Sequence, residues 1–571
     1  MRVTLGGLSV ALFVLNSAVV ATAQSIPAAG TTARNNLSVR AVRTSKPIVI
    51  DGLMDEAAWA TATAVGGFTQ AEPHAGEPAS EATEVRVLYD AEFLYVGAVL
   101  HDRDASHIVV NDIRKDFKED DQDDFEVLLD TFHDRRNGYL FLTNAAGARA
   151  DRQIANEGRE INTSWDGVWS VKTRRTADGW TVEMAIPFRT LRYQLGSADG
   201  WGINFARRIR HKNEVTYWSP VPRAFSITRV SLAGTLDGLE IDTQSRDLRI
   251  KPYVTGRTVR DVGGVKAVTG EAAGLDVTYG VTRHLGLNLS VNPDFAQVEA
   301  DEQQVNLTQF SQFFPEKREF FLENSGIFYV GDAARNNRVQ LAPTPDEDLL
   351  LFFSRRIGLS PDGRAVPIPA GIRLTGTALG MTIGALAIQT RRFGTSPANQ
   401  YGVLRLRKNL LPGSDVGLVI LDREALGNGN DRNWNRVAGV DANFRLPGTW
   451  DWNSYAVSTR KPGRSAAQYA WRSSLNHEGN FFHAKVGVLE IGSGFSDDLG
   501  FFRRTDTRKY LADIGLRPRP LWLSHIGARE MHPHITWNYY ETLDGRISAK
   551  DLHTGYTFFQ NSGAYFELSV N

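Results

Sequence analysis

The sequence predicts an all-β protein in which an N-terminal β-sandwich is followed by a membrane-type antiparallel β-barrel. The main observation is the alternation of apolar and polar residues in LDVTYGVTRHLGLNLSVN, which begins at Leu275 and indicates two strands joined at Arg283-His284. The same period of two returns in residues 469–476 and 564–570. With 52 Gly and 10% aromatic residues, the composition is also typical of a β protein rich in turns.

The N-terminus predicts export. Arg2 is followed by an uncharged run over residues 3–20 and by Ala21-Thr22-Ala23, a pattern typical of a secretory signal peptide and its cleavage site. We therefore assign residues 1–23 to a signal peptide; a first core strand or an anchoring helix is the alternative. Residues 24–40 are small and polar without periodicity, and we expect them to form a linker.

Composition excludes several classes of protein. Beyond the signal no run of about 20 apolar residues appears, which argues against a helical membrane protein, whereas barrel strands need only about 10 alternating residues. The chain has no cysteine, so disulfides and Cys-ligated zinc are ruled out. With 64 basic and 65 acidic residues and no basic cluster, we expect no nucleic-acid partner. The 571 residues exceed one sandwich core, so at least two domains are expected.

The first predicted domain spans residues 41–243. It has short strands, at residues 84–88, 93–100 and 124–129, separated by polar turns at the spacing typical of a sandwich. Few helical patterns interrupt them. We therefore expect a β-sandwich.

The second predicted domain spans residues 248–571. Its alternating segments are longer, and Trp and Tyr lie at or near many strand ends, as aromatic girdles at the two membrane interfaces would explain. These aromatics are Trp434, Trp450, Trp452, Tyr455, Trp522, Trp537, Tyr539 and Tyr540. We expect a barrel in contact with outer-membrane lipid. The alternative is a second soluble β-domain whose aromatics fill an ordinary core.

An acidic segment of the first domain is a candidate metal site. DFKEDDQDDFEVLLD, residues 116–130, carries eight carboxylates, and hard oxygen ligands at this density can hold Ca²⁺. Asp123, Asp124 and Asp130 are the first candidates because they flank a strand. The alternative is a solvated acidic loop that leads into the strand, since the regular EF-hand spacing is absent.

The first domain also has more indoles than a core of its size needs. Sugar rings stack on aromatic faces while charged and amide groups bind their hydroxyls. Trp180 and Trp201 lie within strand patterns and are expected in the core. Arg207, two residues after Phe205 in the same strand, is a candidate partner for hydroxyls. The carbohydrate-binding candidates beside turns are Trp165, Trp169 and Trp218.

These residues resemble the family 9 carbohydrate-binding modules. The motifs that carry the resemblance are Ile50-Asp51-Gly52, Asp55-Glu56, Trp59, Tyr89-Asp90, Leu94-Tyr95-Val96, Asp124-Phe125-Glu126-Val127, and Trp180 with Glu183 and Ile186-Pro187-Phe188. The resemblance implies a β-sandwich, calcium-stabilised in some members, that grips the end of a glycan between aromatic side chains. It also implies a setting in carbohydrate catabolism.

Alternation is lost between residues 292 and 328, NPDFAQVEADEQQVNLTQFSQFFPEKREFFLENSGIF, an acidic stretch that ends in a cluster of Phe. With FFSRRIG at residues 352–358, this segment resembles a signature of bacterial outer-membrane proteins that pair a family 9-like domain with a barrel of unassigned function. The resemblance implies that the chain is exported to the bacterial outer membrane. We treat residues 293–345 as a plug or connector within the barrel domain.

Residues 316–319 place four charges in succession, so a strand here would turn a charge toward lipid. We therefore expect this segment to fold in the lumen or over a mouth of the barrel. One interpretation is a luminal plug with ion pairs to barrel-lining Arg355 and Arg356. The alternative is a periplasmic connection between the two domains.

No catalytic motif is present: there is no G-x-S-x-G, H-E-x-x-H, P-loop or Rossmann fingerprint. We expect a carbohydrate-binding outer-membrane protein for polysaccharide capture or uptake and carbohydrate catabolism. The alternative is a hydrolase that acts on O-glycosyl bonds, and whether the chain is an enzyme stays open at this point. Because residues 567–571 stop partway through an alternating run without a terminal aromatic residue, we expect a sequence truncated at its C-terminus.

Overall fold

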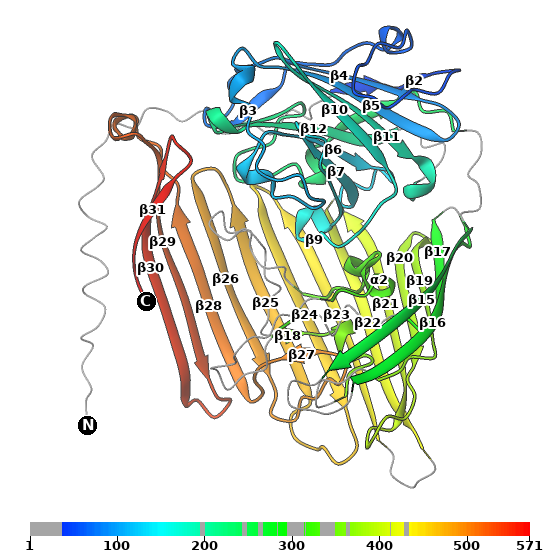
Figure 1. Ribbon diagram of the computed structural model, residues 1–571. Coiled ribbons are helices and arrows are strands. Elements are labelled where there is room, and N and C mark those ends of the chain that lie inside the picture. Colours follow the sequence, from blue (N-terminus) through cyan, green and yellow to red (C-terminus); the bar gives the residue numbers. More distant parts are fainter. Residues whose placement is uncertain are drawn as a thin grey trace, which may run out of the picture. The chain divides into compact units, whose positions relative to one another are not determined.

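The fold is all-β, as predicted, and Figure 1 shows the course of its strands. The predicted signal peptide, and the predicted linker up to residue 36, lie outside the described residues. The computed structural model describes residues 37–193, 200–241, 248–260, 267–282, 284–293, 313–314, 316–331, 349–360, 366–411, 413–427 and 433–571.

The first domain consists of two sheets. The larger has nine strands, in the order β1 (Ser38–Arg40), β14 (Gly234–Asp237), β12 (Trp201–Ile209), β6 (Asp124–Asp130), β7 (Gly138–Asn144), β8 (Arg149–Ala155) and β9 (Glu160–Asn162), with β13 (Glu214–Tyr217) beside β12 and β3 (Thr69–Glu72) beside β13. The smaller has five, in the order β10 (Ser170–Thr176), β11 (Gly179–Pro187), β5 (Phe93–His101), β4 (Thr83–Tyr89) and β2 (Val42–Arg43). Strand β1 lies in the stretch predicted as linker and pairs with β14. The central strands of the first domain are buried on both faces, and side chains from both sheets share one core.

The opening motif of the first domain wraps around one buried carboxylate. Glu183 of β11 is 0% exposed, and it accepts hydrogen bonds from the backbone N–H groups of Gly52 (2.7 Å) and Asp51 (3.0 Å) and from Nε1 of Trp59 (3.0 Å). Gly52 has φ +88°, and a Cβ there would lie 3.0 Å from the carbonyl carbon of Thr173. The motif residues therefore tie the chain's entry segment onto the smaller sheet.

The second domain is one antiparallel sheet of 15 strands, each paired with the next such strand along the chain. Its strands are β15 (Leu248–Arg260), β16 (Ala267–Gly280), β17 (Leu285–Val291), β19 (Ala370–Ala378), β20 (Met381–Gln389), β21 (Ala398–Leu411), β22 (Ser414–Leu426), β23 (Trp434–Leu446), β24 (Trp450–Arg460), β25 (Tyr469–Glu478), β26 (Phe482–Ile491), β28 (Thr507–Leu516), β29 (Ala528–Glu541), β30 (Ile547–Gln560) and β31 (Tyr565–Val570). Within the described strand pairings, none joins β15 to β31.

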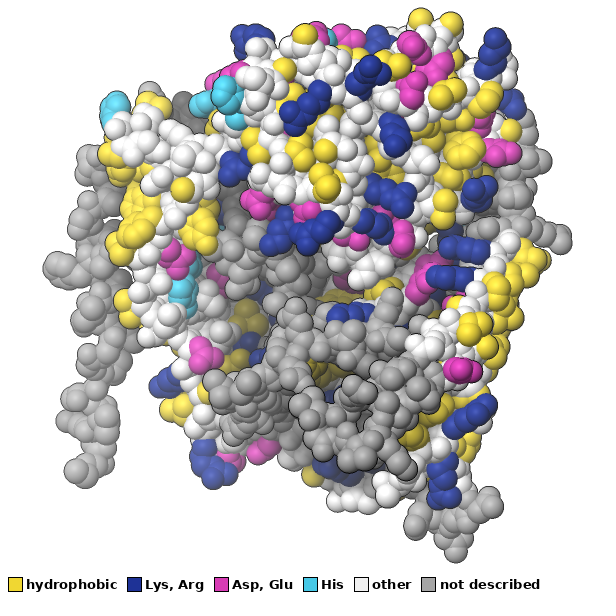
Figure 2. All heavy atoms as spheres, in the orientation of Figure 1, with side chains coloured by type: hydrophobic (Ala, Val, Ile, Leu, Met, Phe, Trp, Pro, Cys, Tyr) yellow, Lys and Arg dark blue, Asp and Glu magenta, His cyan; other side chains and the backbone are white. Residues whose placement is uncertain are grey.

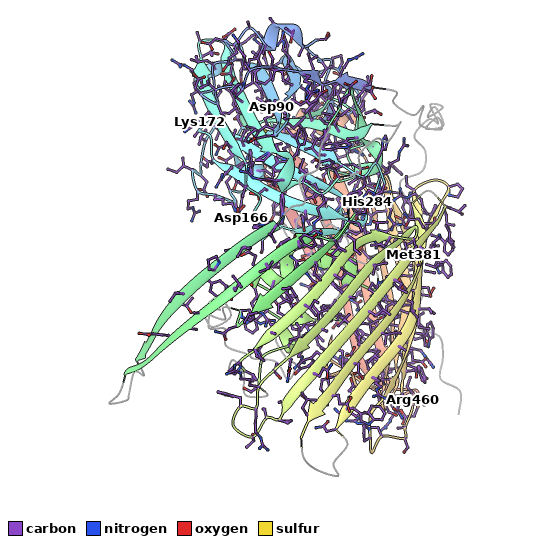
Figure 3. The ribbon with its side chains drawn as sticks, turned by 90° about the vertical axis from the view of Figure 1, so that its right-hand side faces the viewer. Asp90, Asp166, Lys172, His284, Met381 and Arg460 are labelled. Carbon is purple, nitrogen blue, oxygen red and sulfur yellow. The ribbon has the colours of Figure 1, made fainter. Side chains whose placement is uncertain are left out.

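The β15–β16 hairpin extends beyond the rest of the sheet. Its two strands pair from Leu248 to Arg260, whereas β16 pairs with β17 only over residues 275–280. Figure 3 shows these two strands leaving the sheet, with His284 at the turn before β17 and Met381 at the start of β20. Arg460, the last residue of β24, lies at the opposite end of the strands.

The large sheet has the polarity of a membrane wall. On β23 the Val440 side chain is 57% exposed, whereas its neighbour Asp441 is 4% exposed and binds Arg405 of β21 through two hydrogen bonds of 2.6 and 2.7 Å. Figure 2 shows hydrophobic side chains on the outside of the C-terminal strands and of β15 and β16. Exposed apolar residues recur along the sheet at Ile372, Ile420, Val486, Ile514, Ile535, Leu552 and Leu568. Buried cations recur at Arg373, Arg405, Arg407, Arg472, Lys485 and Lys509. A soluble antiparallel sheet turns its polar face to solvent, whereas this sheet exposes apolar side chains on its outer face.

Helical elements are short. The helices in the described part of the chain are all too short or too polar to span a bilayer. They are α2 (Glu319–Leu322) and the 3-10 helices η1 (Trp59–Thr61), η2 (Ala105–His107), η3 (Glu119–Asp121), η4 (Asn156–Gly158), η5 (Phe188–Thr190), η6 (Arg210–Lys212), η7 (Val230–Leu232), η8 (Ser325–Phe328), η9 (Ser354–Arg356) and η10 (Leu521–Ile526).

An inner segment, residues 316–331 and 349–360, packs against the buried face of the large sheet. It contains α2, η8, η9 and β18 (Leu349–Leu350), which pairs with β27 (Phe501–Phe502). Its buried side chains Phe321, Phe328, Val330, Leu349, Leu351 and Ile357 form one cluster with Leu386, Val403, Val419, Val437 and Val457 of the sheet. Residues 294–312, 315 and 332–345 of the predicted plug or connector lie outside the described residues.

The placement of Arg355 and Arg356 on the barrel wall is a wrong prediction. Both lie on η9 of the inner segment and not on a strand. Arg355 lies over the ring of Phe314 at 5.4 Å, and Nε of Arg356 donates to the carbonyl oxygen of Gly500 at 3.2 Å. Within the inner segment Glu316 pairs with Arg318 at 2.7 Å, while Glu323 pairs with Arg192 of the sandwich at 2.8 Å and with Arg373 of β19 at 3.4 Å.

Candidate functional site

Charged and amide side chains join the sandwich to the inner face of the large sheet. Figure 2 shows Lys, Arg, Asp and Glu gathered along this junction. The pairs that cross it are Arg159 with Asp451 (2.9 Å), Glu157 with Arg445 (2.9 Å), Asn156 with Arg407 (2.6 Å), Glu72 with Arg519 (2.7 Å), Arg223 with Glu530 (2.8 Å), and Arg136 with Asp415. Three of these sandwich residues lie within 156–159, at and beside η4, so this turn between β8 and β9 is one of the places at which the sandwich is docked.

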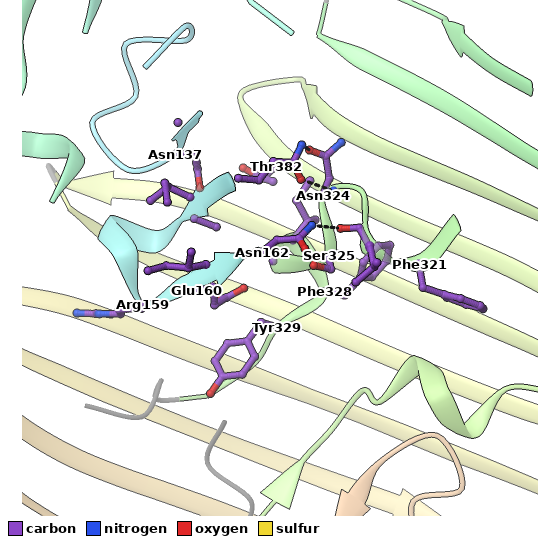
Figure 4. Close-up of a pocket in the computed structure, with 18 of the residues that line it drawn as sticks. Asn137, Arg159, Glu160, Asn162, Phe321, Asn324, Ser325, Phe328, Tyr329 and Thr382 are labelled. Carbon is purple, nitrogen blue, oxygen red and sulfur yellow. Dashed lines mark hydrogen bonds between the residues drawn. The ribbon is translucent and has the colours of Figure 1, made fainter. Parts of the chain in front are cut away.

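A cavity of about 560 Å³ lies beside this turn, between the sandwich and the inner segment. The volume falls in the range of sites for small ligands. Figure 4 shows residues of β9 facing the turn that carries Asn324 and Ser325, with the ring of Tyr329 below Glu160. The cavity is lined by aromatic residues, among them Tyr139, Phe321, Phe328, Tyr329 and Phe352, and by polar residues, among them Asn137, Gln153, Arg159, Glu160, Asn162, Arg192 and Asn324.

Hydrogen bonds fix the polar walls of the cavity. Nδ2 of Asn162 donates to the carbonyl oxygen of Leu322 at 2.6 Å, and the backbone N–H of Asn324 donates to Oε1 of Gln153 at 3.0 Å (Figure 4). These bonds hold β8 and β9 against the inner segment. Aromatic faces beside fixed amide groups are the surroundings that sugar rings and their hydroxyls require.

Glu160 of β9 lines the cavity, and the pKa of its carboxyl is shifted far from the ordinary value. Burial raises its pKa to about 7, although the nearby guanidinium of Arg407 acts in the opposite direction. Nδ2 of Asn156 donates to its Oε1 at 2.5 Å. A carboxyl that titrates near neutrality can carry a proton or release it at the pH of the surroundings.

Two of the predicted sugar platforms are core residues. Trp169 is 2% exposed and packs edge-on against Phe141, with ring centroids 5.2 Å apart. Trp218 is 3% exposed and lies 5.6 Å from the ring of Phe205. The expectation that they lie exposed beside turns is wrong, because both rings fill the space between the two sheets. Trp165 is only half-buried, and it packs against Tyr139 at 5.1 Å, itself a cavity residue.

Arg207 is also buried and is a wrong choice for a sugar contact. It is 1% exposed, and burial lowers its pKa to about 10. Its guanidinium donates to the carbonyl oxygens of Ala82 (3.0 Å) and His101 (2.6 Å) and to Oγ1 of Thr83 (3.0 Å). These bonds tie β12 to the ends of β4 and β5.

Asp123, Asp124 and Asp130 do not form one metal site. Asp124 and Asp130 begin and end β6, about 20 Å apart at the rise of a strand. Asp130 instead accepts the N–H groups of Asp134 (3.2 Å) and Arg135 (2.8 Å) and so closes a turn. All three carboxyls are buried, which raises the pKa of each.

Asp123 lies in a different cluster, with Asp102 and His211. The possible ligand atoms of these three residues lie within 4.8 Å of one another. One carboxylate oxygen of Asp102, one of Asp123 and both ring nitrogens of His211 are buried without a hydrogen-bond partner. No motif in the sequence points to this cluster, because its members come from three separate segments of the chain.

The cavity residues were missed for the same reason. Glu160, Asn162 and Tyr329 carry no motif, and they meet only because η4 and β9 dock against the inner segment. The loss of alternation between residues 292 and 328 was the one signal that pointed to Phe321 and Phe328.

Glu160 predicts a pH dependence of stability. Because its pKa is raised in the folded state, the folded protein holds a proton that the unfolded chain has lost, so its contribution is present at acid pH and disappears as pH rises toward about 7. Glu160→Gln removes this loss. Urea unfolding of the full chain in detergent at about pH 5 and about pH 8 should show a smaller decline for the variant than for the wild type. Equal declines would show that Glu160 titrates normally.

Comparisons with known proteins divide the chain at the same place as the fold. Residues 50–216 match the model described as Carbohydrate family 9 binding domain-like, and residues 245–368 match the model described as Domain of unknown function (DUF5916). No curated protein matches the sequence significantly. The first match supports carbohydrate binding by the sandwich.

Solved structures with some similarity include both kinds of domain. A family 9 carbohydrate-binding module from Caldicellulosiruptor kristjanssonii in complex with cellotriose is 17% identical, covers 37% of this chain and 98% of its own, and gives a TM-score of 0.24. OccK11 (OpdR) of Pseudomonas aeruginosa is 10% identical, with 79% and 94% covered and a TM-score of 0.26. Wzi of Escherichia coli, a carbohydrate-binding β-barrel of the outer membrane, is 11% identical, with 57% and 81% covered and a TM-score of 0.26. On the family models, residues 50–216 form a family 9 carbohydrate-binding-module-like domain, followed by a region shared with a family of unknown function.

Proposed function

We propose that this chain is a carbohydrate-binding protein of the bacterial outer membrane that takes part in the capture or uptake of a polysaccharide and in its catabolism. The observation that carries the proposal is the cavity of about 560 Å³ in which the family 9-like sandwich meets the inner segment of the sheet. A glycan bound there touches both domains. Binding by the first domain is thereby coupled to the inner face of the second.

The lining of the cavity supports a glycan as the ligand. Phe328 and Phe352, with rings 5.5 Å apart, and Tyr329 supply aromatic surface. Asn162 and Asn324 supply amide groups whose positions are set by hydrogen bonds to the opposite wall. A pocket with apolar faces and a few fixed polar groups binds by stacking and gains its specificity from the hydroxyl contacts.

The polarity of the large sheet supports the membrane location. Apolar side chains recur on the outer face from β19 to β31, whereas the inner face carries buried charged side chains beside the apolar cluster that packs on the inner segment. Lipid stabilises such an outer face, because the apolar side chains on it need no contact with water. In water the same face would leave many large apolar side chains exposed on one surface, which monomeric soluble proteins rarely do.

Glycoside hydrolysis is the alternative function, and Glu160 is the residue that favours it. A general acid needs a carboxyl whose pKa is raised by burial, as that of Glu160 is. A second carboxylate at the right separation is also required. Asp134 and Glu316 also line the cavity, but both are held by hydrogen bonds, Asp134 by Asn137 at 2.6 Å and Glu316 by Ser354 at 2.7 Å.

Replacement of a cavity aromatic should weaken glycan binding. In Tyr329→Ala a stacking face is lost, and we expect the affinity for an oligosaccharide to fall about tenfold, the equivalent of about 1.4 kcal/mol. Tyr329→Phe keeps the ring and should bind nearly as well as the wild type. The measurement is titration calorimetry of the full chain in detergent with soluble cello-, xylo- and manno-oligosaccharides.

Trp165→Ala serves as the comparison in the same titrations, because it removes the half-buried indole of the sandwich, which does not itself line the cavity. If Trp165→Ala abolishes binding and Tyr329→Ala does not, the glycan lies on the sandwich alone and the cavity proposal is wrong. Release of new reducing ends by the wild type, lost in Glu160→Gln, would favour the hydrolase. No binding to any glycan would contradict both functions.

A charge on the outer face should be tolerated only near the strand ends. Val440→Arg, in the middle of β23, is expected to lower the free energy of unfolding in lipid by about 2–4 kcal/mol, whereas Leu446→Arg, at the end of the strand, should cost only about 0–1 kcal/mol. Urea titration of the protein refolded into phospholipid vesicles measures both. Equal, small costs would mean that β23 faces water.

A structural Ca²⁺ ion in the sandwich stays a proposal. The unpartnered carboxylate oxygens of Asp102 and Asp123 are the place where it would bind. CaCl₂ should raise the melting temperature of the EDTA-treated wild type and leave that of Asp123→Asn unchanged. An equal rise in both proteins would place the ion elsewhere.

A further inference from the structure

A row of four histidines and one glutamate crosses the inner face of the C-terminal strands. His483 comes from β26, His532 and His534 from β29, His553 from β30 and Glu567 from β31. Ring centroids of neighbouring imidazoles are 5.0 Å apart for His483 and His532, 4.6 Å for His532 and His534, and 5.0 Å for His534 and His553. No sequence motif joins these residues, because their spacing in the chain follows only from the strand register.

The hydrogen bonds of His534 and His553 leave two lone pairs facing each other. Nδ1 of His534 lies 3.1 Å from the carbonyl oxygen of His532, and Nδ1 of His553 lies 2.6 Å from Oδ1 of Asn571. Both partners are acceptors, so each Nδ1 carries the proton of the neutral ring. The two Nε2 atoms are then both acceptors, yet they lie 2.9 Å apart. A positive charge between them is needed to remove this repulsion.

A carboxylate beside the two imidazoles completes a set of three metal ligands. Oε1 of Glu567 lies 3.5 Å from Nε2 of His553, and possible ligand atoms of all three residues lie within 4.8 Å of one another. A tetrahedral ion with bonds of about 2.0–2.1 Å holds its ligand atoms about 3.3 Å apart, which these separations approach. The other oxygen of Glu567 accepts a 2.9 Å hydrogen bond from Oγ1 of Thr557, which orients the carboxylate.

Two glycines make room for the imidazoles. A Cβ at Gly555 would lie 2.7 Å from Cε1 and 2.9 Å from Nε2 of His534. At Gly515 it would lie 2.2 Å from Nε2 of His483 and 2.8 Å from Nε2 of His532. The rings therefore occupy space that any other residue at these two positions would fill, so the row is a built feature of the sheet.

We propose that His534, His553 and Glu567 bind a divalent transition-metal ion of the zinc type on the inner face of the sheet. Two imidazoles and one carboxylate suit Zn²⁺ and its neighbours, whereas Ca²⁺ and Mg²⁺ prefer oxygen ligands alone. The hydrogen bonds at Nδ1 of both histidines are the outer partners that such ligands use to fix their tautomer. With three protein ligands, the fourth position is open to water or to a passing ligand. The side chains of His553 and Glu567 are 32% and 23% exposed, so an ion reaches them from the solvent.

Zinc titration of the full chain tests this site. The protein is prepared in detergent without a polyhistidine tag and stripped with EDTA, and calorimetry with ZnCl₂ should show one ion bound per chain. His534→Ala/His553→Ala should weaken binding by more than the ~10–100-fold that loss of an outer partner costs. Glu567→Gln and Gly555→Ala, which keep both histidines, should each weaken it about tenfold or more.

The control is His525→Ala, which removes an exposed histidine of η10 outside the row and should leave zinc affinity unchanged. Zinc should also raise the melting temperature of the wild type and of His525→Ala, but not that of His534→Ala/His553→Ala. The proposal is wrong if the wild type binds no zinc, if His534→Ala/His553→Ala binds it equally well, or if CaCl₂ competes with zinc at equal concentration. If the double variant does not fold, Glu567→Gln decides the question by the same criteria.

Discussion

The ion pairs buried on the inner face of the large sheet are the interactions on which the rest of the structure depends. A sheet that turns Val440 outward must turn Asp441 inward, and an inward charge left without a partner would cost several kcal/mol. Some pairs close within the sheet, as Arg405 and Asp441 do. Others close across the junction, where Arg159 reaches Asp451. The sandwich is therefore docked by the same charges that make the inner face polar.

This docking explains why the cavity lies where it does. The turn of η4 and strand β9 are anchored by the junction pairs, while the inner segment is anchored by its apolar cluster against the sheet. The cavity lies between these two surfaces and has both aromatic and amide walls. The burial that raises the pKa of Glu160 follows from the same arrangement. The proposed glycan cavity and the raised pKa are thus consequences of one interface.

Motifs in the sequence marked structural positions more reliably than binding positions. The Asp51-Gly52 and Trp59 motif was recognised, and its role is to surround the buried carboxylate of Glu183. Trp169 and Trp218 were chosen as platforms because they sit beside turns, but a flat indole near a turn also fills the space between two sheets. Asp124 and Asp130 are close in the sequence, but they lie at the two ends of one extended strand and are therefore far apart in space. The row from His483 to Glu567 escaped notice because its members share only a strand register.

By itself, the sequence determined the all-β class, the division near residue 245 and the alternation that gives the large sheet an apolar outer face, because all of these follow from local periodicity and motif spacing. Only the tertiary structure decided which face of each indole is covered, which carboxylates meet His211, and which residues line the cavity. Those outcomes depend on contacts between segments hundreds of residues apart, and such contacts are set by strand register and by the pairing of buried charges. Neither leaves a periodic signal in the chain.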